Sequence, residues 1–201
     1  MMSQDKQFKQ LERRAYLSYH QDGIIDLLIG WGTLAFGLVI ALDSSVWTML
    51  AWMPILFYVP LKNRITVPRL GYVKFDHSRG GTGRWIIAFL FFGFLMVAIF
   101  GMVVFLLSKG APSTIVTWIR EDTLLFYGLV GVIGFGVAGL ISGIPRLYIY
   151  ALLSLLFMGA GQLLGVAEYI PFLLLGASIL AAAAVLLARF VRRYPLAIEE
   201  G

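Results

Sequence analysis

The sequence predicts an all-α fold: a polytopic membrane helix bundle of about six transmembrane helices, with the N-terminus and the C-terminus in the cytoplasm. Composition, a series of long apolar segments and a one-sided distribution of basic residues support this prediction. Of the 201 residues, 60% are hydrophobic and 13% are charged, whereas a soluble domain is about 45–50% apolar and about 25% charged. The mean hydropathy is +0.86. Because a globular core of this size could not bury so much apolar surface, we expect lipid to surround the fold.

Six segments are apolar enough to serve as transmembrane helices, since a helix needs about 20 residues to cross about 30 Å of hydrocarbon. They are 24–42, 45–61, 85–107, 123–142, 147–165 and 170–188. The second is the shortest and contains Pro54 and Pro60, which a bundle tolerates because neighbouring helices can satisfy the freed carbonyl groups. The join between 142 and 147 is open to a second interpretation, as one continuous bent element.

The basic residues predict the orientation of these segments. Fourteen of the 16 lysines and arginines fall in the N-terminal segment, the 62–84 loop, the 143–146 turn and the C-terminal tail. Only Lys109 and Arg120 lie on the opposite side. Since positive charge is retained in the cytoplasm, the domain organisation is a cytoplasmic amphipathic segment (1–23), a six-helix membrane domain (24–188) and a cytoplasmic tail (189–201). A cell membrane, crossed several times, is the expected location.

The 62–84 loop is the largest expected soluble segment, and it carries six basic residues against the single Asp76. Within it, 66–75 has strand-like composition, while 5–20 is expected as a helix along the inner leaflet. Each basic residue near anionic lipid contributes about 1 kcal/mol of attraction. Binding of anionic headgroups and simple enforcement of topology are equally compatible with the loop. Nucleic acid is not an expected partner, because the inner leaflet competes for these charges.

Asp26 is the acidic residue deepest in the predicted membrane domain, about one turn inside the first span, and Asp22 lies four residues earlier on the same helical face. With His20 they could bind a metal or relay a proton, but an interfacial carboxylate pair is the more ordinary interpretation, and no metal or cofactor is expected. Because a desolvated carboxylate needs a partner, we expect a guanidinium of the loop to pair with it. The candidate ligand or lipid-headgroup residues are Asp22, Asp26, Arg64, Arg69 and Lys74.

Glycines recur along the fourth and fifth predicted helices. Small residues let helix backbones approach closely in lipid, where there is no hydrophobic drive for association. The candidate helix-packing residues are Gly131, Gly136, Gly139, Gly161 and Gly165. Packing inside one bundle is the favoured interpretation, and a pore-lining or dimer face is the alternative.

Two stretches carry a resemblance: Tyr19-His20-Gln21-Asp22-Gly23-Ile24-Ile25-Asp26-Leu27 and Pro68-Arg69-Leu70-Gly71-Tyr72-Val73-Lys74-Phe75. They resemble an uncharacterised group of small bacterial polytopic membrane proteins. Those proteins have an aromatic-x-x-Asp-Gly-x-x-Asp entry segment and a Pro-Arg-x-Gly-Tyr-Val-Lys-Phe cytoplasmic loop. The resemblance implies a bacterial inner membrane as the location, and it gives no information about a catalytic activity.

No catalytic motif accompanies these features. The chain has no cysteine, which excludes disulfides, thiolate metal sites and cysteine nucleophiles. His20 and His77 are far apart in sequence, and no H-E-x-x-H motif is present. The expected function is therefore a non-enzymatic interaction, accessory or lipid-sensing component. Its expected partners are membrane lipids with anionic headgroups, and either a second copy of the chain or another membrane protein. The alternative is a passive channel or small-molecule permease along the fourth helix, and a lipid-modifying enzyme using the two aspartates comes third.

Overall fold

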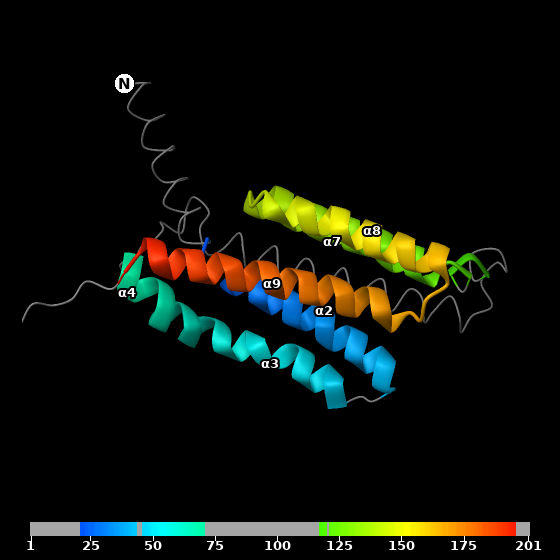
Figure 1. Cartoon of the computed structure of the whole chain (residues 1–201), viewed down its shortest axis with the longest axis horizontal. Helices are drawn as coiled ribbons and strands as arrows, with labels where there is room; N and C mark the ends of the chain where they lie inside the picture. The colour runs from blue at the N-terminus through cyan, green and yellow to red at the C-terminus, as the bar shows by residue number, and fades with distance from the viewer. Residues whose placement is uncertain (1–20, 44–45, 71–116, 120, 196–201) are drawn as a thin grey trace, which may run out of the picture. The chain divides into compact units, whose positions relative to one another are not determined.

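A computed structural model describes residues 21–43, 46–70, 117–119 and 121–195. The main elements are α2 (Ile24–Leu42), α3 (Val46–Leu61), the π-helix η1 (Lys62–Thr66), α4 (Val67–Leu70), α7 (Thr123–Ser142), α8 (Arg146–Leu164) and α9 (Tyr169–Arg193). Figure 1 labels the α-helices among them. In these residues every regular element is a helix, so the predicted all-α fold is confirmed for this part of the chain. Four of the helices, α2, α7, α8 and α9, are long and apolar enough to cross a membrane.

The predicted helices agree closely with the described ones. The predicted 24–42 and 123–142 have the bounds of α2 and α7, while α8 and α9 correspond to 147–165 and 170–188, with α9 continuing to Arg193. The predicted 45–61 corresponds to α3, which contains both of its prolines. The predicted 85–107 helix and the amphipathic helix at 5–20 lie outside the described residues.

The segment after α3 differs from the expectation of a loop with strand-like composition. Its described part, 62–70, is helical: α3 passes into η1 and then into α4 without leaving helical backbone angles. The Val67 N–H bonds to the Lys62 carbonyl oxygen, which is the wide turn of a π-helix. The strand expectation for 66–75 is therefore wrong over 66–70. Extending an existing helix fixes one residue per added hydrogen bond, so local β propensity is easily overridden.

The chain divides into two compact units, residues 1–74 with 173–201 and residues 75–172. In the first unit α2 and α3 form a helical hairpin that turns at Asp43, a non-glycine residue with φ of 44°. α9 packs along α2 in the opposite direction. The facing pairs are Gly23 with Leu186, Gly30 with Leu180, and Leu34 with Gly176. The start of α2 therefore meets both the end of α3 and the C-terminal part of α9.

In the second unit α7 and α8 form an antiparallel hairpin. The chain leaves α7 at Gly143, whose φ of 71° is a conformation that favours glycine, and α8 begins at Arg146. The interpretation of this region as one continuous bent element is thus wrong. At the far end of the hairpin, Gln162 Nε2 donates a hydrogen bond of 2.6 Å to the carbonyl oxygen of Glu121.

Candidate functional site

The most tightly organised polar site in the described residues is centred on the Asp22 carboxylate, which has no exposed surface. Lys62 Nζ lies 2.6 Å from Asp22 Oδ2. The Thr66 hydroxyl donates a 2.6 Å hydrogen bond to the same oxygen, and the Ile24 backbone N–H donates one of 3.2 Å to Oδ1. Both carboxylate oxygens are therefore engaged by partners from two different elements. We call Asp22, Lys62 and Thr66 the buried junction.

Local geometry explains why these three residues meet. The α2–α3 hairpin returns the chain to the level at which α2 began, and η1 then presents Lys62 and Thr66 from one turn of helix. Asp22 stands just before α2, where its oxygen satisfies one of the first backbone N–H groups and its charge complements the helix dipole. The start of α2 therefore stabilises a carboxylate at position 22 even without Lys62 and Thr66.

Gly23 brings α9 to the same place. Its φ is 75°, and a Cβ there would lie 2.7 Å from the Ala183 carbonyl oxygen and 3.0 Å from Leu186 Cβ. Only glycine satisfies both the left-handed backbone and the close approach of α9. The buried junction is therefore enclosed by the ends of three helical elements.

Burial sets the energetics of the junction. The side chains of Lys62 and Asp22 are only 4% and 0% exposed. Removing two charges from water is costly, and the cost is offset only by close pairing and additional hydrogen bonds, which Thr66 and the Ile24 N–H supply. Asp26, one turn into α2, is likewise fully buried. Such an arrangement ties the hairpin to one conformation.

The predicted partner of the Asp22/Asp26 pair was a guanidinium of Arg64 or Arg69. For Asp22 the structure corrects this prediction, because the partner of Asp22 is Lys62. Arg64 is exposed. Arg69 instead donates from Nη1 to the Ile65 carbonyl oxygen at 2.9 Å. Lys74 lies outside the described residues. A flexible ammonium close to the helix end reaches a buried carboxylate more readily than a planar guanidinium several residues further on.

Lys62 and Thr66 were missed by the sequence reasoning. The available signal was position: Lys62 is the first basic residue after the second apolar segment, so it lies nearest the depth of Asp22. Thr66 follows four residues later, which on a helix places it beside Lys62. Because residues 62–84 were expected to form a loop, the helical spacing of Lys62 and Thr66 was not used.

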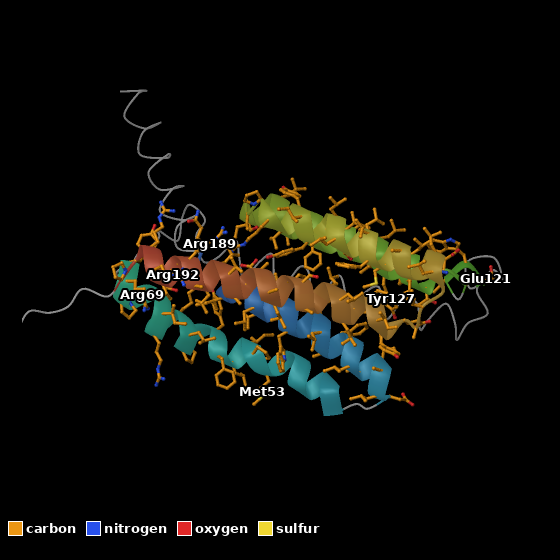
Figure 2. The ribbon with its side chains drawn as sticks, in the orientation of Figure 1. Met53, Arg69, Glu121, Tyr127, Arg189 and Arg192 are labelled. Carbon is orange, nitrogen blue, oxygen red and sulfur yellow. The ribbon has the colours of Figure 1, made fainter. Side chains whose placement is uncertain are left out.

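A second feature of the first unit is its concentration of positive charge at one end. All six lysines and arginines among its described residues belong to η1, α4 or the last turns of α9: Lys62, Arg64, Arg69, Arg189, Arg192 and Arg193. Figure 2 shows Arg69, Arg189 and Arg192 at this same end. We call these six residues the basic end. The other end of the α2–α3 hairpin carries Asp43.

The glycines predicted to pack helices fall into two groups. Cβ atoms at Gly131 and Gly161 would overlap Ser154 and Pro171, and one at Gly139 would lie 3.1 Å from the Tyr148 ring. At Gly136 and Gly165 a Cβ would meet none of the described residues within 4 Å. Gly165 ends α8 instead, with φ of 61°.

Taken together, the long apolar helices, the buried junction and the basic end have the character of a helical membrane protein. Comparison with protein-family models, with curated proteins and with solved structures gives no match. The resemblance to small bacterial polytopic membrane proteins therefore stays a prediction. In the part of the chain that the structure describes, no three histidine, aspartate or glutamate side chains are grouped so that they could hold a metal ion.

Proposed function

We propose that this protein is a six-span integral membrane protein with cytoplasmic termini, and that it acts as a non-enzymatic accessory or lipid-sensing component. Its basic end would face the anionic lipids of the cytoplasmic leaflet. The observation that carries the proposal is the confinement of every described lysine and arginine of the first unit to that end. Positive charge at one end of a helix bundle is the signature of the cytoplasmic side.

The exposure of these basic side chains supports contact with lipid. Arg64, Arg189 and Arg192 are exposed. The buried junction pairs Lys62 with Asp22, so this carboxylate neutralises one of the six positive charges of the basic end. Long basic side chains at helix ends extend their charges to the headgroup level. Each contributes about 1 kcal/mol of attraction to an anionic surface.

The first expected result concerns topology. A reporter fused after Leu107 should lie outside the cytoplasm, and one fused after Glu200 should lie inside, because the charge distribution retains both termini in the cytoplasm. Paired alkaline phosphatase and fluorescent-protein fusions measure the two locations. Finding both fusion sites on the same side would contradict the six-span arrangement.

The second expected result concerns lipid. The purified chain in zwitterionic detergent should melt at a higher temperature when phosphatidylglycerol is added, and phosphatidylcholine should have a much smaller effect. The variant Arg64→Gln/Arg189→Gln/Arg192→Gln should lose most of this difference, since each exposed charge contributes about 1 kcal/mol. The stabilisation should also weaken at high salt.

The control for that experiment is the melting temperature without added lipid, which the triple variant should retain because the three side chains are exposed. Equal stabilisation of the wild type by the two lipids would contradict the proposed role of the basic end. So would an unchanged response of the triple variant.

The geometry gives less support to the alternatives. For a channel along the glycine face of α7, the spaces at Gly128, Gly131 and Gly139 are filled by side chains of α8, namely Met158, Ser154 and Tyr148. For a lipid-modifying enzyme, both oxygens of Asp22 are already engaged by Lys62, Thr66 and a backbone N–H. The basic end therefore provides the better-supported proposal.

A further inference from the structure

Arg69 differs from the other arginines of the basic end because its side chain is half-buried and held in place. Its Nη1 donates a hydrogen bond of 2.9 Å to the Ile65 carbonyl oxygen, one helical turn earlier. Its Nε is buried and has no hydrogen-bond partner among the described residues. A guanidinium fixed in this way loses less conformational entropy on binding a ligand than a freely moving side chain does.

One edge of the fixed guanidinium has the geometry to bind an anion with two oxygens. With Nη1 directed to Ile65, the pair formed by Nε and Nη2 is the edge that can donate two parallel hydrogen bonds to two oxygens of one anion. A buried donor without an acceptor is destabilising, so an oxyanion that reached Nε and accepted its hydrogen bond would relieve that cost. A lysine in the same place would offer charge without the paired geometry.

The surroundings of Arg69 favour an anion. Thr66 lies just before α4 and donates a hydrogen bond to Asp22, and Lys62 already neutralises the charge of this carboxylate. The last turns of α9 bring further arginines to the same end of the unit, as the packing of Gly23 against Leu186 requires and as Figure 2 shows for Arg189 and Arg192. The six basic residues at this end of the unit therefore outnumber the two buried aspartates, Asp22 and Asp26.

We infer that Arg69 forms the centre of a specific site for the phosphate group of an anionic lipid headgroup, with the α9 arginines adding attraction. This inference rests on the proposed function and adds to it a defined ligand group and a defined residue. It distinguishes one oriented guanidinium from the general charge of the basic end. The phosphate diester supplies the two oxygens, and the acyl chains lie along the adjoining helices.

The test is a titration of the purified full-length chain with phosphatidylglycerol in zwitterionic detergent, followed by native mass spectrometry and by melting temperature. Arg69→Lys should weaken binding of the first lipid molecule by about tenfold, since paired charge-assisted hydrogen bonds are lost. Arg64→Lys makes the same chemical change at an exposed position, and it should have a much smaller effect. Arg69→Gln, which keeps a donor for Ile65, is the second variant and should also bind weakly.

The possible outcomes distinguish a specific site at Arg69 from general attraction by the exposed charges of the basic end. Equal affinities of wild type, Arg69→Lys and Arg64→Lys would overturn the site, while the proposed function would stand if the triple glutamine variant still lost its lipid response. Weak binding by Arg69→Lys together with a normal response of the triple variant would overturn the role of the exposed charges, including the added attraction of the α9 arginines, and would leave only the Arg69 contact. Inorganic phosphate serves as the competitor. If millimolar phosphate displaces the lipid and raises the melting temperature alone, the ligand is free phosphate and the lipid assignment is overturned.

Discussion

Lys62→Met is expected to destabilise the protein by about 3–5 kcal/mol, the usual cost of removing one member of a buried ion pair. The change would leave the fully buried Asp22 carboxylate with Thr66 and the Ile24 N–H but without its cation. Methionine keeps most of the volume of the side chain, so loss of packing contributes little. Reversible denaturation in mixed micelles measures the difference, and accumulation in the membrane should fall in parallel.

A double-mutant cycle provides the control for this result. Asp22→Asn alone should also destabilise the fold, because it removes the negative charge that lies 2.6 Å from the buried Lys62 ammonium. Lys62→Met combined with Asp22→Asn should cost much less than the sum of the two single changes. Strict additivity, or a harmless Lys62→Met, would mean that the ion pair does not hold the hairpin together.

The limits of the α2 and α7 helices could be predicted because lipid imposes a simple rule. A segment that crosses hydrocarbon must satisfy its backbone hydrogen bonds internally, so apolar length determines where such a helix begins and ends. Asp43 and Gly143, which end α2 and α7 with positive φ, stand where the apolar runs stop. Composition and backbone geometry agree at these positions, and prediction succeeds there.

The buried junction could be predicted only in part, because its partners depend on tertiary structure. The need of a buried aspartate for a cation follows from electrostatics alone. The choice of Lys62 depends on the continuation of α3 into η1, which the composition of 66–75 did not indicate. The π-turn and the hairpin together decide which side chains reach Asp22.

The packing glycines show a similar limit. Spacing along α7 places Gly131, Gly136 and Gly139 among the candidates, yet only the first and third approach side chains of α8. One sequence does not reveal which arc of a helix faces its neighbour when every arc is apolar. Gly176 of α9, where a Cβ would lie 2.6 Å from the backbone nitrogen of Leu34, was not among the predicted positions for this reason.

Gly176→Ala is expected to destabilise the protein by about 1–3 kcal/mol, the usual cost of overpacking. A Cβ at this position would lie 2.6 Å from the backbone nitrogen of Leu34 and 2.7 Å from its Cα. Because these atoms belong to the backbone of α2, no change of rotamer can relieve the overlap, and α9 would have to move away. The alanine would otherwise favour a helix, so any loss of stability reports the contact.

The matched control is Gly32→Ala on α2, where a Cβ would meet none of the described residues within 4 Å. Both changes add one methyl group to a helical glycine, and both gain the same helix propensity of about 1 kcal/mol. Thermal unfolding in detergent should therefore rank Gly32→Ala at or above the wild type and Gly176→Ala clearly below it. If the two variants unfold at the same temperature, α9 does not pack on α2 at this distance. The enclosure of the buried junction by α9, which depends on the same packing through Gly23, would then fail with it.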